Sequence, residues 1–155
     1  MNNRTLNVWN IAKKLPLGKV LFNQMIQLKA PYFKSIRTKI IELRPDFCQV
    51  QMSKEKRILN HLDTVHAIAL CNLAELTGGL MTEVTLPPSH RWIPDGMQVN
   101  YIKKATTDLT AVAYPLTPIQ AGQSIPNRFV ACVEVHDQNQ ALVFRAEINM
   151  WVTSR

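Results

Sequence analysis

The chain has 155 residues, of which 46% are hydrophobic and 19% are charged, and its mean hydropathy is -0.07. This composition is typical of a soluble globular protein and excludes disordered, collagen-like and fibrous chains. The length suits one domain with a sizeable core, so we expect a single domain over residues 1–155. The longest uncharged apolar run, residues 64–74, is shorter than the ~20 residues of a membrane span, and no signal-like stretch follows Met1. We therefore expect a cytoplasmic protein with no membrane partner.

The net charge of +7 is concentrated in the N-terminal part of the chain. Residues 1–57 hold twelve lysines and arginines against three acidic residues, whereas residues 58–155 hold six against eight. Such a basic segment can attract nucleic acid, an anionic membrane face or a phosphorylated ligand. Its cations are scattered, however, and they are not interleaved with aromatic residues as in an RNA-recognition motif. We interpret the segment first as solvated surface and expect no nucleic-acid partner.

The spacing of cysteines and histidines favours neither a metal site nor a redox motif. The three cysteines lie in apolar segments, as is typical of reduced core residues: Cys48, Cys71 and Cys132. The four histidines form no His-x-x-x-His or His-Glu-x-x-His pair: His61, His66, His90 and His136. We expect no metal ion.

The N-terminal part is predicted to be helical over residues 7–14 and 18–32, with Pro16 between the two helices. In the second helix, apolar residues recur on one face: Val20, Leu21, Met25, Leu28 and Tyr32. Two short β-like runs follow, residues 38–43 and 47–52. The turn residues Arg44-Pro45-Asp46 between these runs predict a hairpin.

The most distinctive segment comprises residues 64–79. It is apolar on nearly every side and ends in Gly78-Gly79, which predicts a helix that is buried all round and ended by glycine. Asp63 and Thr64 are expected to cap its N-terminus. A loop with three prolines follows it: Pro87, Pro88 and Pro94.

The last third of the chain is predicted to consist of strands. Four runs are rich in β-branched and aromatic residues: 97–103, 109–116, 129–136 and 141–152. The final run alternates apolar and polar residues, as an antiparallel strand with one wet face does. The sequence therefore predicts an α+β fold in which a curved antiparallel sheet wraps a buried helix.

Residues 60–75, Asn-His-Leu-Asp-Thr-Val-His-Ala-Ile-Ala-Leu-Cys-Asn-Leu-Ala-Glu, resemble the central-helix motif of hotdog-fold acyl-CoA thioesterases, in particular the phenylacetate-pathway type. In that type an Asn precedes a His by six residues, and an acidic residue follows the His by nine in a Leu-Ala-acidic context. Asn60, His66 and Glu75 hold these spacings. The element order is also similar. The resemblance implies a hotdog core over residues 36–155 and a helical extension over residues 1–35, as in an uncharacterised hotdog branch with N-terminal helices.

The resemblance also implies a reaction, the hydrolysis of an acyl thioester of coenzyme A or of an acyl carrier protein. Glu75 would activate water or attack the thioester carbon, and the backbone N–H of Ala67 would hold the oxyanion at the helix N-terminus. His66 and Asn60 would orient the carbonyl or the water. Coenzyme A enters as part of the substrate, and no bound cofactor is implied. The family's His-Gly-Gly is His66-Ala67-Ile68 here, so the glycines that allow close approach of the carbonyl are missing.

Helix geometry adds a constraint that does not depend on the family. Nine residues make about 2.5 turns, so His66 and Glu75 face opposite sides of the helix and lie ~13 Å apart along its axis. If both act, Glu75 of one chain must meet the His66 region of another across a twofold interface. We therefore expect a homodimer or a dimer of dimers, with Asn100 and Tyr101 of the uncharged run 97–102 near the twofold.

Each candidate residue also has a structural alternative. Glu75 would otherwise point to solvent or bond to backbone at the helix end, His66 would be a helix-start residue, and Asn60 would close a turn. Three cations before the motif could attract ligand phosphates or be simple surface charge: Lys54, Lys56 and Arg57. Two other functions stay open. One is acyl-CoA or fatty-acyl binding without turnover, and the other is an interaction module whose basic part contacts nucleic acid or an acidic partner.

Overall fold

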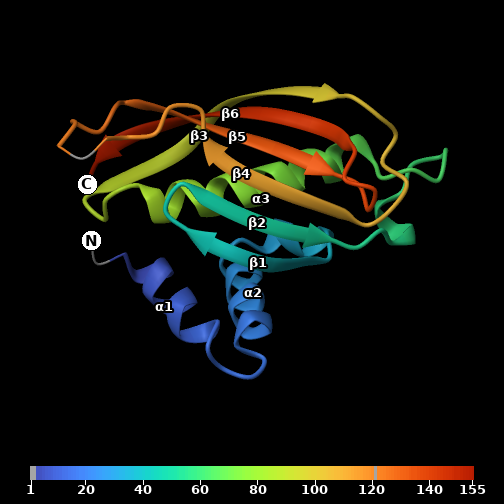
Figure 1. Ribbon diagram of the computed structural model, residues 1–155, viewed down its shortest axis with the longest axis horizontal. Coiled ribbons are helices and arrows are strands. Elements are labelled where there is room, and N and C mark those ends of the chain that lie inside the picture. Colours follow the sequence, from blue (N-terminus) through green and yellow to red (C-terminus); the bar gives the residue numbers. More distant parts are fainter. Residues whose placement is uncertain (1–2, 121) are drawn as a thin grey trace.

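In the computed structural model, which describes residues 3–120 and 122–155, three α-helices pack with a six-stranded antiparallel sheet (Figure 1). The helices are α1 (Arg4–Ala12), α2 (Gly18–Lys29) and α3 (Ala67–Thr85), and two 3-10 turns are η1 (Pro31–Ser35) and η2 (Lys56–Ile58). The strands are β1 (Thr38–Arg44), β2 (Phe47–Met52), β3 (His90–Tyr101), β4 (Leu109–Pro115), β5 (Arg128–His136) and β6 (Leu142–Ser154). The predicted α+β plan, with helices early and strands late, is confirmed.

The sheet has the strand order β1-β2-β4-β5-β6-β3, so β1 and β3 form its two edges. The predicted hairpin is confirmed, and its turn places Asp46 at φ 60° while the Asp46 N–H donates to Thr85 Oγ1 over 2.8 Å. The alternation predicted for the last strand is also present, because Phe144, Ala146 and Ile148 are buried on one face. The sheet therefore keeps one apolar face and one wetter face.

Strand β3 differs from the prediction because it begins at His90, well before residue 97. Pro94, expected in a loop, lies inside the strand and pairs with Met150, and a bulge follows between Pro94 and Gly96. A proline has no N–H to donate, which an edge strand tolerates because one of its sides has no ladder. Strand β3 is therefore a long edge strand, and it contacts α3 at Cys71, Gly79 and Glu83.

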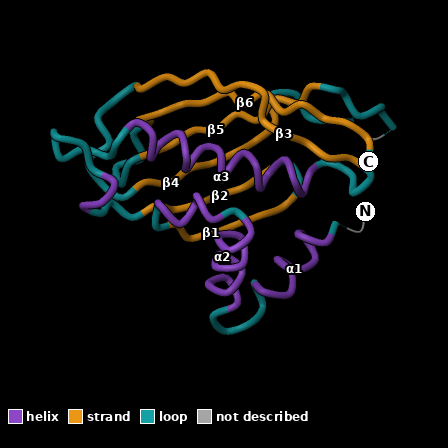
Figure 2. Tube along the Cα trace, turned by 180° about the vertical axis from the view of Figure 1, so that it is seen from behind, coloured by secondary structure: helices purple, strands orange, loops and turns teal. Residues whose placement is uncertain are grey.

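Helix α3 lies across the apolar face of the sheet, as Figures 1 and 2 show from opposite sides. The prediction that Gly78 and Gly79 end this helix is wrong, because both lie in its middle and are buried. A Cβ on Gly78 would lie 3.1 Å from Ile148 Cδ1, and one on Gly79 would lie 3.0 Å from Trp92 Cη2. The two glycines therefore let the helix approach the strands closely, and hydrogen bonding continues through them to Thr85.

The N-terminal helices form a hairpin that is tied to the end of α3. Trp9 of α1 packs edge-on against Phe22 of α2, with ring centroids 5.2 Å apart. Glu83 of α3 anchors the hairpin and the edge strand together. It accepts from Asn3 Nδ2 at its carbonyl, from Thr5 Oγ1 at 3.3 Å and from Trp92 Nε1 at 3.0 Å. The face of α2 that carries Leu21, Met25 and Leu28 points to solvent.

The cysteines divide into two kinds. Cys48 and Cys132 are fully buried, and burial raises the pKa of both thiols, as expected for reduced core residues. Cys71 is also free and packs against the core, but it is only partly buried because α3 turns it toward the end of β3. No helix of the described residues is long and apolar enough to cross a membrane.

The close packing at Gly78 leads to a stability prediction. Gly78→Leu should lower the free energy of unfolding by about 1–3 kcal/mol, because the added side chain overpacks the contact with Ile148 and Val133. Gly96→Ala serves as the control, since its Cβ would meet only Asn149 Nδ2 at an ordinary 3.6 Å. Urea denaturation measures both variants. Equal stabilities would show that the interface between α3 and the sheet is loosely packed.

Candidate functional site

The N-terminus of α3 is capped by His66. His66 has an extended backbone, and its Nδ1 accepts from the Ile68 N–H at 3.1 Å while its carbonyl accepts from the Ala69 N–H at 2.9 Å. The expectation that Asp63 and Thr64 cap the helix is wrong. Two backbone bonds hold the chain extended up to this point, from Val65 N–H to the Ala105 carbonyl and from His66 N–H to the Ile58 carbonyl. The helix therefore cannot begin before Ala67.

The first turn of α3 carries the backbone N–H of Ala67, the donor that is expected to hold the oxyanion. The Ala67 N–H makes no hydrogen bond within residues 3–120 and 122–155, whereas the next N–H, that of Ile68, is taken by His66. A free N–H at a helix N-terminus is aligned with the helix dipole and favours a negative charge. The Ile68 side chain, at the second missing glycine, is 55% exposed and points away from the core.

Asn60 organises the loop that leads into His66. Its Oδ1 accepts from the backbone N–H groups of Leu62 at 2.9 Å and Thr64 at 3.3 Å, and its Nδ2 donates to Thr64 Oγ1 at 2.8 Å. The Thr64 carbonyl in turn accepts from the Asn60 N–H. These bonds close a turn ahead of the helix, which is the alternative to a catalytic role that was given for Asn60. In this structure Asn60 therefore shapes the loop before His66.

Glu75 lies on an exposed position of α3 between the buried residues Ala74 and Leu76. It is in the middle of the helix, so it does not bond to backbone at a helix end. Its carboxylate makes no hydrogen bond or ion pair in the part of the chain that the structure describes. The side chain borders a pocket of about 330 Å³ lined mainly by apolar residues of the N-terminal hairpin, α3 and β3: Ile26, Ala30, Phe33, Leu80, Trp92 and Pro94.

The face of α3 that carries Glu75 is turned toward the edge strand β3. One turn before Glu75, Cys71 Sγ lies 3.3 Å from the hydroxyl of Tyr101, the last residue of β3. One turn after it, Gly79 faces the ring of Trp92 near the start of β3. Residues four apart share a helix face, so Glu75 lies between these two contacts. A second chain placed along β3 would therefore lie next to Glu75.

Cys71 and Tyr101 were not singled out together by the sequence. Hydrogen bonding to Cys71, together with burial, raises the pKa of Tyr101 to about 12. The contact with Cys71 therefore favours the protonated phenol. The ring rests on Phe144, with centroids 5.4 Å apart. The i, i+4 spacing of Cys71 and Glu75 indicates that they share a helix face. Nothing in the sequence indicates that this face contacts Tyr101 at the end of a strand.

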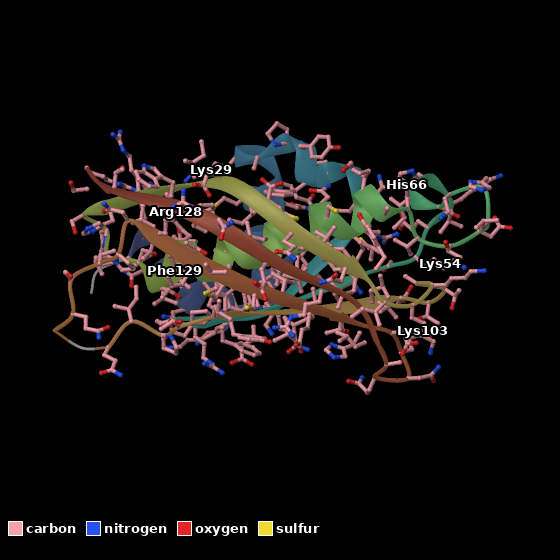
Figure 3. The ribbon with its side chains drawn as sticks, turned by 90° about the horizontal axis from the view of Figure 1, so that it is seen from above. Lys29, Lys54, His66, Lys103, Arg128 and Phe129 are labelled. Atoms are coloured by element: carbon pink, nitrogen blue, oxygen red, sulfur yellow. The ribbon has the colours of Figure 1, made fainter. Side chains whose placement is uncertain are left out.

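The three cations predicted near the substrate lie before the Asn60 loop. Lys54 follows β2, where its N–H donates to Asp108 Oδ1 at 2.7 Å, and Lys56 and Arg57 lie in η2. Arg57 forms a salt bridge with Glu55 at 3.0 Å, and Glu55 forms a second one with Arg37. Lys54 and Lys56 have no carboxylate partner among the described residues. Figure 3 shows Lys54 and His66 at the same end of the molecule.

The structure thus brings some of the predicted residues together and leaves others apart. Asn60, His66 and Ala67 form one cluster at the N-terminus of α3, and Lys54 lies at that end. Glu75 is separated from them by the helix itself, by ~13 Å along its axis and half a turn around it. Among the described residues, no group of three or more histidine, cysteine or acidic side chains is arranged to hold a metal ion.

Comparison with solved structures shows what this arrangement resembles. The crystal structure of a genomics target, APC5556, is 41% identical to this chain and covers 97% of it and 98% of its own chain, with a TM-score of 0.82. The thioesterase HI1161 from Haemophilus influenzae is 17% identical over 76% of this chain and 78% of its own, with a TM-score of 0.66. The protein smu.793 from Streptococcus mutans, bound to acetyl CoA, is 17% identical over 77% and 90%, with a TM-score of 0.66.

These neighbours confirm the hotdog fold and the resemblance to hotdog thioesterases that the sequence indicated. No significant match is found among the curated proteins. A family model described as a domain of unknown function, DUF4442, matches residues 18–152, which span α2 of the N-terminal hairpin and the sheet with its central helix. The chain therefore belongs to the DUF4442 family, and its fold is a hotdog with an N-terminal helical hairpin.

Proposed function

We propose that this protein hydrolyses an acyl thioester at a site completed by two copies of the chain. The observation that carries the proposal is the position of Glu75 on the α3 face turned toward β3 and beside an apolar pocket, where its carboxylate has no partner among the residues that the structure describes. Thioesterases of the same fold support thioester hydrolysis in general. The acetyl CoA in the Streptococcus mutans structure supports coenzyme A as the carrier of the acyl group.

The chemistry is divided between the middle of α3 in one copy and the N-terminus of α3 in the other. The acyl group enters the pocket beside Glu75, which either removes a proton from water or attacks the thioester carbon. The Ala67 N–H of the partner copy holds the oxygen that becomes negative, with the helix dipole behind it. His66 caps that helix and Asn60 holds the preceding loop, so both position the donor. When Glu75 acts as the base, the hydroxide adds to the thioester carbon, the C–S bond breaks, and Glu75 gives its proton to the leaving thiolate. When Glu75 attacks, the C–S bond breaks to leave an acyl-Glu75 anhydride, the thiolate takes a proton from water, and a second water hydrolyses the anhydride to release the acid.

An exposed edge strand supports the two-copy arrangement. Strand β3 is twelve residues long and pairs with β6 on one side, while its other side has no strand partner among the described residues. It also exposes Ile93 and Tyr101, which are 63% and 51% accessible. A long unpaired edge is a site for pairing with another chain, and a twofold pairing of β3 with itself would satisfy its backbone groups.

Sedimentation equilibrium tests this arrangement. At micromolar concentration we expect a species of twice the 17.7 kDa chain mass, or a multiple of that dimer. Ile93→Lys, which places a charge on the exposed face of β3, should weaken the dimer and reduce activity in parallel, because the site needs both copies. A wild-type protein that sediments only as a monomer yet remains active would rule out the shared site.

The catalytic role of Glu75 is tested with Glu75→Gln, which keeps the size of the side chain but can neither accept the proton nor attack. We expect kcat for acyl-CoA hydrolysis to fall at least about a hundredfold. His66→Ala should have a milder effect, since His66 acts through the position of the Ala67 N–H. Glu42→Gln is the matched control, because it removes an exposed carboxylate from β1 that pairs with Arg44.

The outcomes separate the alternatives for this protein. Hydrolysis that survives Glu75→Gln within a few-fold would show that the catalytic assignment is wrong. Acyl-CoA binding by the wild-type protein without any hydrolysis would favour the binding protein instead, with Ala67 and Ile68 in place of the glycines as the structural reason.

The cations at the same end as His66 generate a separate prediction. Joint replacement of Lys54, Lys56 and Arg57 by Gln should raise KM for acyl-CoA severalfold and leave kcat nearly unchanged, because remote phosphate contacts are equal in ground and transition states. Added salt should have the same effect. The control triple replaces Arg4, Lys13 and Lys14 of the N-terminal hairpin, which removes the same charge elsewhere. An unchanged KM with a loss of nucleic-acid affinity would assign these cations to a nucleic-acid partner.

A further inference from the structure

The end of the N-terminal hairpin exposes an unusual amount of apolar surface. Five large side chains are between 38% and 75% exposed, and we call them, with Lys13 and Lys14, the hairpin tip: Ile11, Leu15, Leu17, Leu21 and Met25. Four of the five, all except Leu17, border a groove of about 280 Å³ between α1 and α2 that is lined by apolar residues. An exposed apolar patch of this kind on a small domain marks a binding surface.

The hairpin does not need these side chains for its own packing. Trp9 and Phe22 fill its interior, and Gly18 lies so close to the Ala12 carbonyl that any side chain would clash with it. Leu17 has a left-handed backbone conformation, with φ 58°, that costs a leucine conformational free energy. Yet it is the most exposed of the five apolar side chains. The tip therefore presents apolar groups outward at a cost to folding.

The charge around the tip identifies the chemistry of the partner. Residues 1–41, the segment that contains the tip, hold eight lysines and arginines and no acidic residue, and two of these cations, Lys13 and Lys14, belong to the tip. Lys13 and Lys14 are exposed beside Leu15, and neither has a carboxylate partner in the described part of the chain. Apolar side chains flanked by lysines are the pattern of a segment that inserts into the headgroup region of an anionic bilayer.

The shape of the tip favours a flat, deformable partner. Figures 1 and 2 show α1 and α2 projecting from the body on the side of β1, with the loop that joins them at the far end, away from β3. A projecting end can enter a lipid surface, whereas it offers a globular partner little area. A second copy of this chain would bring the same eight cations and no acidic counterpart from the same segment.

We propose that the hairpin tip docks this protein on the surface of an anionic lipid bilayer, with the apolar side chains in the interfacial region and Lys13 and Lys14 at the phosphates. In the bound state β3 lies on the opposite side of the molecule from the lipid. Docking of this type is peripheral and reversible and needs no membrane-spanning segment. It departs from the expectation of no membrane partner, and it is independent of whether the site next to Glu75 is catalytic.

Vesicle co-sedimentation of the full-length protein tests the proposal. Vesicles of equimolar phosphatidylcholine and phosphatidylglycerol should bind the protein, and pure phosphatidylcholine vesicles should bind it at least about tenfold less. Leu15→Ser with Leu17→Ser should reduce binding to the anionic vesicles at least about tenfold, because apolar burial is lost. Lys13→Gln with Lys14→Gln should do the same, and high salt should mimic it.

Two matched variants control for general effects of surface changes. Leu62→Ser removes a leucine that is 57% exposed in another loop, and Lys103→Gln with Lys104→Gln removes an adjacent lysine pair from another loop. Both should bind anionic vesicles as the wild type does, and far-UV circular dichroism checks that all variants are folded. Wild-type protein that stays in the supernatant with anionic vesicles overturns the proposal. A tip variant that binds anionic vesicles as the wild type does also overturns it. A tip variant with a lower sedimentation mass than the wild type overturns it as well, because the tip would then join two copies of the chain.

Discussion

The packing of α3 against the apolar face of the sheet is the constraint on which the other features depend. The helix buries large side chains such as Leu73, Leu76 and Met81, each of which contributes about 1.5–3 kcal/mol relative to exposure. Gly78 lets it approach β5 and β6 closely enough to do so. Because one helix spans the sheet, its N-terminus and its middle are held at fixed positions relative to the strands. That packing therefore fixes the positions of the Ala67 N–H and of Glu75.

The candidate site occurs where this packing stops. The side of α3 that carries Cys71 and Glu75 meets β3, an edge strand of the sheet, beyond which no further strand of residues 3–120 and 122–155 covers the helix. A carboxylate can remain unpaired there because it reaches solvent, while the pocket beside it stays apolar. Glu83, one turn after Gly79, lies on the same helix face, but its carboxylate is hydrogen-bonded. Its bonds to Thr5 and Trp92 hold the N-terminal hairpin in place as one wall of that pocket.

Several errors of the sequence-based prediction have one physical origin. Helix ends and strand starts were assigned from local preferences, but tertiary contacts decided them. Gly78 and Gly79 favour a helix end in isolation, yet close packing against Ile148 and Trp92 keeps them helical. Pro94 favours a loop, yet an edge strand accepts it. The apolar spacing of Leu21, Met25 and Leu28 was recognised in α2, but these side chains are exposed, and Phe22 is the large side chain that turns inward.

The sequence by itself determined the order of elements, the apolar character of the central helix and the hotdog resemblance, because periodicity and residue spacing are local properties. It also determined that His66 and Glu75 cannot meet within one chain, since helix geometry alone separates them. The tertiary structure decided what each residue contacts. It made His66 the helix cap, engaged Asn60 within its own loop, joined Cys71 to Tyr101 and turned Glu75 toward the edge strand. Those relations depend on segments distant in sequence, which only the folded chain brings together.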